Sequence, residues 1–206
     1  TAIFPPALHM AAVGAVIKDS PIFMGGQDCS GSENGAHTGD MSVAMLADAG
    51  ARGVIVGHSE RRTDHGETNA EILTKVQAGM DAKLGVVLCV GETLAERESG
   101  AAQDVVRSQL DACLPSQIDH PGIVIAYEPV WAIGTGKVAT PDDIADMHTA
   151  IRTWLEENRP AIGKTHILYG GSVKASNAAE VFAAAEVGGA LVGGASLKSD
   201  DFLGII

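Results

Sequence analysis

Aromatic side chains are scarce in this chain: Phe, Trp and Tyr make up only 4% of its 206 residues, whereas 25 residues are glycine. The core must therefore be built mainly from Val, Ile, Leu and Ala, with many tight turns between its elements. Hydrophobic residues reach 46% and charged residues only 19%, which excludes an intrinsically disordered chain. A length of 206 residues suits one large domain or at most two small ones.

Cysteine is also rare, and Cys29, Cys89 and Cys113 lie far apart, with no Cys-x-x-Cys pair. An odd number without paired spacing argues against a disulfide framework and against a zinc site. No apolar run approaches the roughly 20 residues that cross a bilayer. The first residues also lack the basic and then apolar regions of a signal peptide. We therefore expect a reduced, cytoplasmic protein with no membrane segment and no bound metal.

Positive charge is in short supply, because 14 Lys and Arg residues are outnumbered by 26 Asp and Glu residues. The net charge is −12 and the sequence pI is about 4.8. Such an acidic surface repels phosphate backbones, so binding to nucleic acid is not expected. An anionic small substrate would need a local positive site.

Short apolar runs recur along the chain, each bounded by Gly or Pro, and predict seven strands. None of them alternates polar with apolar residues, so both faces of each strand should be covered, as in a parallel sheet. The runs span residues 2–4, 22–26, 53–57, 85–90, 123–127, 167–170 and 190–193.

Segments with helical patterning separate these runs, and the clearest of them starts at Thr140. Thr140 suits an N-cap, Pro141 the first helical position, and the following acids the first turn. We expect helices over residues 68–82, 92–114, 140–157 and 176–187, and a short one capped by Ser199, Asp200 and Asp201. This alternation without a break in composition predicts a single α/β domain over residues 1–206.

Both an open doubly wound sheet and a closed barrel fit this alternation. No Gly-x-Gly-x-x-Gly fingerprint follows the first strand, which argues against a dinucleotide-binding sheet. Polar or glycine residues that suit chemistry follow several different strands, as in (β/α)8 barrels. These are His58, Glu128, Ser172 and Gly193. The sequence therefore favours the barrel.

Two strand ends carry the candidate catalytic side chains. His58 follows one strand, and Arg61 and Arg62 behind it are expected to pair with nearby acids and fix loops. Glu128 lies between an apolar run and Pro-Val-Trp, where partial desolvation suits a general base. A plain loop histidine and a capping or salt-bridging glutamate remain the alternatives.

Glycines mark the candidate anion site. Gly170 and Gly171, and then Gly193 and Gly194, follow the last two predicted strands, where barrels commonly bind phosphate. Successive backbone N–H groups of glycines can donate to an anion. Residues 132–137 contain two glycines close together. Such a segment suits either a loop that closes over a site or a plain flexible connection between two elements.

Four runs, in order and spacing, resemble the triosephosphate isomerase family: VGHSERR at 56–62, AYEPVWAIGTGK at 126–137, YGGSV at 169–173 and GALVGGASL at 189–197. Residues 26–40 resemble that family's long third loop, and residues 89–92 its next strand end. The resemblance covers essentially the whole chain. It implies a TIM (β/α)8-type parallel barrel and an isomerase of glycolysis and gluconeogenesis that needs no cofactor.

The resemblance also implies roles for single residues. Glu128 would be the base that moves a proton between two carbons of a small phosphorylated triose. His58 would be the neutral electrophile that stabilises the enediolate, and Glu60 a supporting acid beside it. The phosphate would be bound by Gly134, Ser172, Gly193 and Gly194. Residues 129–137 would form a lid that excludes water.

The family's chain opens with a strand ending in Asn-x-Lys, then a helix, then a strand ending in Phe-Pro-Pro. Here Phe4, Pro5 and Pro6 stand near the first residue. We therefore expect the N-terminal β-α unit and most of the second strand to be missing from these residues, roughly 40 of a usual ~250. Residues 202–206 resemble the family's ordinary terminus, which argues against a circular permutation.

Loss of that lysine predicts weaker catalysis, since it attracts the phosphate and the enediolate oxygen. Lys137, in the lid, and Lys174, after Ser172, are not placed equivalently. Removing one such cation lowers the rate by a factor on the order of 10³. The alternatives are an inactive phosphate-binding barrel and a piece of an ordinary full-length enzyme.

The loop from Cys29 to Asp40 bears on assembly, because in the family it inserts into a partner subunit beside the Asn-x-Lys segment. With that segment missing, we expect a homodimer whose interface is weakened or altered. Exposed sheet edges would favour association.

Overall fold

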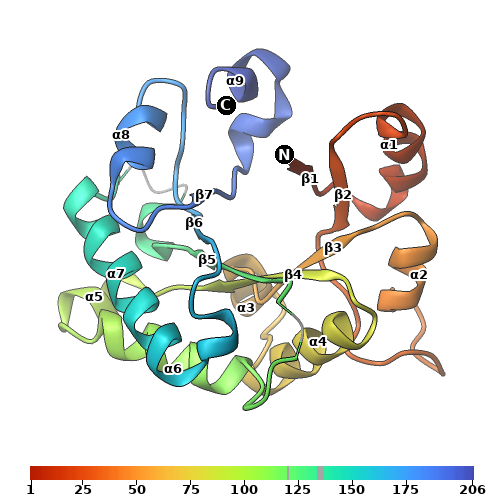
Figure 1. Cartoon of the computed structure of the whole chain (residues 1–206), viewed down its shortest axis with the longest axis horizontal. Helices are drawn as coiled ribbons and strands as arrows, with labels where there is room; N and C mark the ends of the chain where they lie inside the picture. The colour runs from red at the N-terminus through yellow and green to blue at the C-terminus, as the bar shows by residue number, and fades with distance from the viewer. Residues whose placement is uncertain (120, 134–136) are drawn as a thin grey trace. The chain divides into compact units, whose positions relative to one another are not determined.

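Short strands alternate with helices through residues 1–119, 121–133 and 137–206, which the computed structural model describes (Figure 1). These residues form two compact units. The first comprises Thr1–Leu88 and Asp111–Ile123, and the second comprises Cys89–Leu110 and Val124–Ile206. The single domain over residues 1–206 stays a prediction.

The strands of the first unit pair in parallel and in sequence order. They are β1 (Ala2–Ile3), β2 (Phe23–Gly26), β3 (Gly53–Val56) and, as far as Leu88, β4 (Gly85–Val90). Ala2 is in register with Phe23, and Gly53 is in register with both Gly25 and Gly85. This register brings the carboxyl ends of β2, β3 and β4 to one edge.

The second unit continues the pattern with β5 (Ile123–Tyr127), β6 (Ile167–Tyr169) and β7 (Gly189–Ala190). All pairs are parallel, with Ile125 opposite Ile167 and Leu168 opposite Gly189. Seven strands were predicted, and the described residues form seven. A doubly wound sheet reverses its strand order at one point. Within each unit the strands instead follow one another in sequence order, which favours the barrel.

The last strand lies earlier than predicted. We expected residues 190–193, but β7 ends at Ala190, and only the N–H of Leu191 continues the ladder, donating to the carbonyl of Tyr169 at 2.9 Å. At Gly193 the backbone leaves the extended region, with φ −87° and ψ −108°. The Gly-Gly pair therefore turns the chain instead of extending the strand.

Helices and 3-10 turns connect the strands. Their bounds are α1 (Met10–Ile17), α2 (Val43–Asp48), α3 (Ser59–Asp64), α4 (Asn69–Asp81), α5 (Leu94–Glu98), α6 (Ala102–Cys113), α7 (Pro141–Asn158), α8 (Ala178–Ala183), α9 (Ser199–Leu203), η1 (Ala7–His9), η2 (Val130–Ala132), η3 (Pro160–Ile162) and η4 (Gly194–Leu197).

Capping decides where several helices begin. Thr68, Thr93 and Thr140 each accept a hydrogen bond from the backbone of an acid three residues later, and each acid bonds back to the threonine. Such a cap contributes about 1 kcal/mol. The predicted start at Thr140 and Pro141 is confirmed.

The other helix predictions need correction. The single helix expected over residues 92–114 is split into α5 and α6, because Gly100 adopts a left-handed φ of +79°. The helix after Asn177 ends early, since Ala184 is extended. At α9 the cap position is Lys198, with no side-chain cap bond, so Ser199 is helical instead of capping. Helices α1, α2 and α3 were not predicted.

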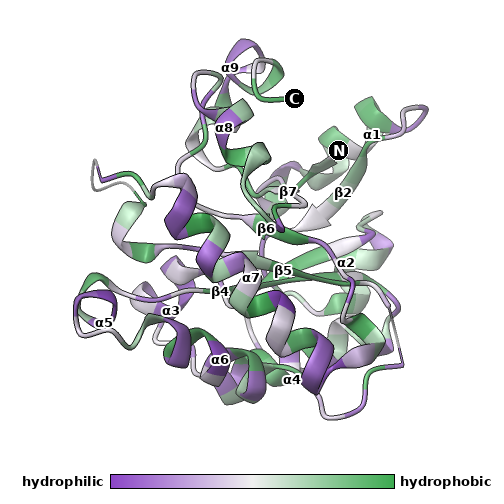
Figure 2. Cartoon of the chain, turned by 60° about the vertical axis from the view of Figure 1, so that its left-hand side comes forward, coloured by the Kyte–Doolittle hydropathy of each residue, from purple (hydrophilic) through white to green (hydrophobic). Residues whose placement is uncertain are grey.

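The strands supply the core. Val54, Val56, Leu88, Ile125 and Ile167 are fully or almost fully buried, as the unbroken apolar runs predicted. Figure 2 shows the hydrophobic colour concentrated in the strands, whereas α7 carries hydrophilic and hydrophobic residues along its length. None of the helices described is long and apolar enough to span a membrane.

Candidate active site

His58 occupies the N-cap position of α3, directly after β3 and Gly57. Its Nδ1 accepts a hydrogen bond from the backbone N–H of Glu60 at 3.3 Å. A neutral ring bonded in this way carries its proton on Nε2. The His58 side chain keeps 27% exposure, so the structure puts a ring N–H donor at a strand end within reach of solvent.

Glu60 lies beside His58, and its role as a supporting acid stays a prediction. Its Oε2 is 3.7 Å from His58 Nδ1, and its side chain is 75% exposed. At that exposure the Coulombic interaction is weak. The stronger link between the two residues is the backbone N–H of Glu60, which fixes the ring tautomer.

Arg61 pairs with two acids, as the sequence predicted, whereas Arg62 bonds to a backbone carbonyl and a side-chain amide. Arg61 Nε lies 2.9 Å from Asp28 Oδ2 and 2.5 Å from Glu67 Oε1. Arg62 donates from Nε to the carbonyl of Gly57 at 2.8 Å and from Nη1 to Asn69 Oδ1 at 2.7 Å. These bonds tie α3 back to the end of β3 and hold the turn that presents His58.

Glu128 follows the last residue of β5 and is only 1% exposed. Its backbone N–H donates to the carbonyl of Val90 at 2.8 Å, so the residue still belongs to the ladder. The predicted desolvation is therefore borne out for this carboxylate.

Two glycines make room for Glu128, and the sequence reasoning did not identify this role. A Cβ on Gly91 would stand 1.8 Å from the carbonyl oxygen of Glu128, and one on Gly170 would stand 2.9 Å from its Cγ. Gly91 is held by Gln109, which accepts from its N–H at 2.8 Å and donates to its carbonyl at 2.9 Å. The tight space beside Glu128 could be recognised only once these strand ends were placed together.

Glu92 organises the residues around Glu128. It is fully buried, and its Oε1 accepts from the Tyr127 hydroxyl at 3.0 Å and from Trp131 Nε1 at 2.8 Å. Its carbonyl accepts from the Val130 N–H at 3.2 Å. Burial and then the negative charge of Glu92 raise the pKa of Tyr127, so its hydroxyl stays protonated and can donate.

Ser172 lies in the loop after β6. Its Oγ donates to the carbonyl of Ala132 at 3.3 Å, which links this loop to η2. Asn177 holds the loop by donating to the carbonyl of Ser172 at 3.2 Å and accepting from the N–H of Lys174 at 2.8 Å. The predicted phosphate ligand is thus part of a braced turn.

Gly193 and Gly194 are exposed, and a Cβ at either position would meet no described atom within 4 Å. The carbonyl of Gly193 accepts two hydrogen bonds from Ser196, one from its Oγ at 2.6 Å and one from its backbone N–H at 2.8 Å. These glycines are therefore not buried in packing. Gly134, the fourth predicted phosphate ligand, lies outside the described residues.

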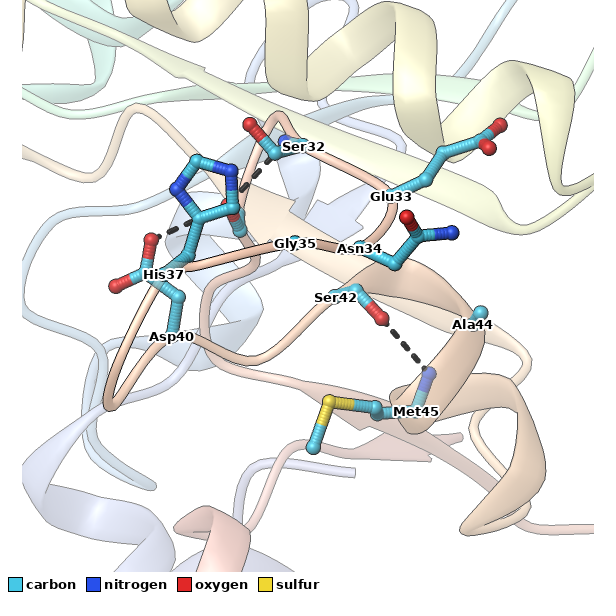
Figure 3. A pocket seen from close by; sticks show the side chains of 10 residues that line it. Ser32, Glu33, Asn34, Gly35, His37, Asp40, Ser42, Ala44 and Met45 are labelled. Carbon is cyan, nitrogen blue, oxygen red and sulfur yellow. Dashed lines mark hydrogen bonds between the residues drawn. The ribbon is translucent and has the colours of Figure 1, made fainter.

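A separate hollow of about 400 Å³ lies in the loop between β2 and α2 (Figure 3). Ser30 accepts from the backbone of Ser32 at 3.2 Å and donates to Asp40 at 3.3 Å, and Ser42 accepts from the N–H of Met45 at 3.3 Å. Neither His58 nor Glu60 lines this hollow. It belongs to the loop predicted to contact a partner.

In the part of the chain that is described, no group of three or more His, Cys, Asp or Glu residues is placed to hold a metal ion.

The comparisons with known proteins agree with one another. The family model described as "Triosephosphate isomerase" matches residues 1–206. The triosephosphate isomerase of Caulobacter vibrioides is 53% identical over 206 residues, which are 100% of this chain and 81% of that protein. The triosephosphate isomerase of Acidiphilium cryptum is 52% identical, covering 98% of this chain and 83% of that protein.

A solved structure extends the match to the fold. The crystal structure of triosephosphate isomerase from Bartonella henselae superimposes with a TM-score of 0.93 at 45% identity, covering 99% of this chain and 84% of that one. The fold is therefore α/β and of the TIM-barrel type, as predicted.

Proposed function

We propose, because the chain belongs to the triosephosphate isomerase family, that it interconverts glyceraldehyde 3-phosphate and dihydroxyacetone phosphate. The observation that carries the proposal is the buried carboxylate of Glu128 at the end of β5, with Gly91 packed against the backbone carbonyl of this residue and Gly170 against its Cγ. That fit holds a base in one place, which proton transfer from carbon requires.

Glu128 takes a proton from one carbon of the bound triose and returns it to the neighbouring carbon. The enediolate between these steps carries negative charge on the former carbonyl oxygen. His58 stabilises that charge by donating from Nε2, the nitrogen that carries the proton when Nδ1 accepts from Glu60. This division between a carboxylate base and a neutral imidazole is the one established for the family.

The substrate phosphate binds at Ser172, Gly193, Gly194 and Gly134. Exposure of Gly193 and Gly194 and the open space at their Cα positions support this role, since backbone N–H groups must approach the phosphate oxygens closely. Residues 129–137 close over the bound triose and exclude water. The link from Ser172 to Ala132 ties the phosphate loop to the start of that lid.

Turnover by these 206 residues on their own is lower than that of a full-length relative, because they do not include the family's Asn-x-Lys pair. The second candidate is a barrel that binds phosphate without turnover. The protein works in glycolysis and gluconeogenesis in the cytoplasm, needs no cofactor, and associates as a homodimer. For these 206 residues on their own, we expect the interface to be altered or weakened.

A coupled assay of glyceraldehyde 3-phosphate conversion tests the proposal. Turnover by the chain that is lost in Glu128→Gln supports an isomerase, and the Caulobacter vibrioides enzyme gives the reference rate. If the parent chain and Glu128→Gln both bind inorganic phosphate but neither turns over the triose, the inactive barrel is supported instead.

A further inference from the structure

One oxygen of the Glu92 carboxylate accepts all of its side-chain hydrogen bonds from the described residues. Oε1 accepts from Tyr127, Trp131 and Arg97, the last from Nη1 at 3.1 Å. Oε2 is buried and has no hydrogen-bond partner among the described residues. A fully buried carboxylate needs a compensating charge, and Arg97 is the cation paired with it.

Arg97 uses its other terminal nitrogen elsewhere. Nη2 donates to Asp143 Oδ1, and the guanidinium carbon lies 4.7 Å from the centre of the Trp131 ring. Asp143 is itself fixed, because its Oδ2 accepts from Thr140 Oγ1 at 2.7 Å and from the Thr140 N–H at 3.0 Å. One planar guanidinium therefore connects Glu92, Trp131 and the first turn of α7.

These contacts bracket Glu128. Tyr127 precedes it, and Val130 and Trp131 follow it; all three bond to Glu92 through side chain or backbone. Glu92 and Trp131 both contact Arg97. Displacement of the guanidinium would therefore loosen the chain on both sides of Glu128.

We infer that Arg97 is a positioning residue for the base: it bridges Glu92 and Asp143 and thereby holds the segment that carries Glu128 against the start of α7. The inference rests on the proposed function for its effect on turnover. Its structural part, the fixing of Trp131, is independent of activity.

The fork of the guanidinium is essential to this account. A lysine would keep one positive charge near Glu92, but a single ammonium is a point charge and cannot reproduce the two-sided bridge. Arg97→Lys therefore separates charge compensation from positioning. Asp143→Asn removes the second ion pair, while its amide oxygen can still accept from Thr140.

The experiment compares Arg97→Lys and Asp143→Asn with Arg107→Lys. Arg107 is the matched control, because it lies on α6, is 44% exposed, and contacts exposed neighbours on its own helix: Asp104 Oδ1 at 3.8 Å and Gln103 Oε1 at 3.2 Å. All variants are made in a Trp154→Phe background, so that Trp131, the other of the two tryptophans, is the sole tryptophan and its emission is excited selectively over that of the two tyrosines.

We measure kcat and KM, the urea midpoint, and acrylamide quenching of Trp131. In Arg97→Lys we expect kcat to fall about tenfold to a hundredfold, with KM and the urea midpoint close to the parent values and stronger quenching. Asp143→Asn should change in the same direction by a smaller factor, and Arg107→Lys should match the parent.

Parental kcat and quenching in Arg97→Lys would overturn the inference. So would a fall in kcat that accompanies a lower urea midpoint while quenching is unchanged, because that is a purely structural effect. If the parent chain has no isomerase activity, the proposed function fails, and quenching alone decides: stronger quenching in Arg97→Lys supports the bridge and parental quenching overturns it.

Discussion

The Cα of Gly91 lies so close to Glu128 that a Cβ added there would stand 1.8 Å from the Glu128 carbonyl oxygen. This carbonyl is backbone and cannot rotate away as a side chain would. Gly91→Ala must therefore shift either the end of β4 or the end of β5. We expect a loss of roughly 1–3 kcal/mol of stability and a fall in kcat of about tenfold or more.

The matched control for this substitution is Gly14→Ala. Gly14 lies in α1, and a Cβ there meets only the Met24 methyl at 3.4 Å. Replacing a helical glycine by alanine is expected to be neutral or stabilising by up to about 1 kcal/mol. Urea midpoints and kcat for both variants check the prediction; a parental Gly91→Ala enzyme would contradict the tight approach.

Lys75 stabilises a buried network in the first unit. Its Nζ lies 2.8 Å from Asp28 Oδ1 and 2.5 Å from Glu67 Oε1. Burial alone would raise the pKa of the Glu67 carboxyl, but hydrogen bonds from Lys75 and Arg61 outweigh it and lower that pKa. Lys75→Met removes one of these two cations and should cost about 3 kcal/mol.

Urea unfolding at pH 7.5 measures that loss, with Lys18→Met as control. Lys18 is exposed at the end of α1, so its replacement should stay within about 0.5 kcal/mol. Equal effects of the two substitutions would show that the network contributes no more than a surface charge.

His148 predicts a loss of stability in mild acid. It is fully buried, Nδ1 lies 3.2 Å from the Glu186 carbonyl, and Nε2 has no partner among the described residues. Burial is the main cause that lowers the pKa of His148 to about 4. The unfolded chain, with an ordinary histidine pKa near 6.5, therefore binds the proton first as the pH falls.

Stability from His148 is thus present above about pH 6.5 and is lost between about pH 6.5 and pH 4, by about 2 kcal/mol at pH 5. His148→Gln cannot titrate, so its unfolding free energy should fall less between pH 7.5 and pH 5. Urea titrations at these two pH values test this. An identical fall in both proteins would assign the acid sensitivity to other groups.

Much of this fold could be predicted from the sequence, because its signals are local. Unbroken apolar runs gave the strands, and Thr140 with Pro141 gave the start of α7. The split at Gly100 was missed, since an isolated glycine in a helical pattern does not reveal its backbone angle. Helix α1, Met10–Ile17, was missed because its residues are apolar on nearly every side.

The residue types of the candidate site could be predicted from the sequence, but the residues that position them could not. Glu128 and His58 stand at strand ends that the pattern marks. Gly91 and Glu92 act on a segment nearly 40 residues away, and nothing local to their sequence shows that distance closing. Such contacts depend on strand register.

Assembly is tested by sedimentation equilibrium over a concentration series. The loop from Cys29 to Asp40 is polar and largely exposed around Glu33 to Gly35. These 206 residues do not include the Asn-x-Lys segment beside which the family's loop inserts, so we expect a dimer formed by them alone to dissociate on dilution. A tight dimer at all concentrations would contradict the weakened interface.

The role of Glu128 is tested most directly by proton NMR of dihydroxyacetone phosphate in D2O. A carboxylic acid formed by taking the carbon proton exchanges it with solvent before returning it, so the chain should place deuterium on the substrate carbon. Glu128→Gln should place none, while binding inorganic phosphate nearly as the parent does. Deuterium incorporation at the parental rate in Glu128→Gln would contradict the assignment of this residue as the base.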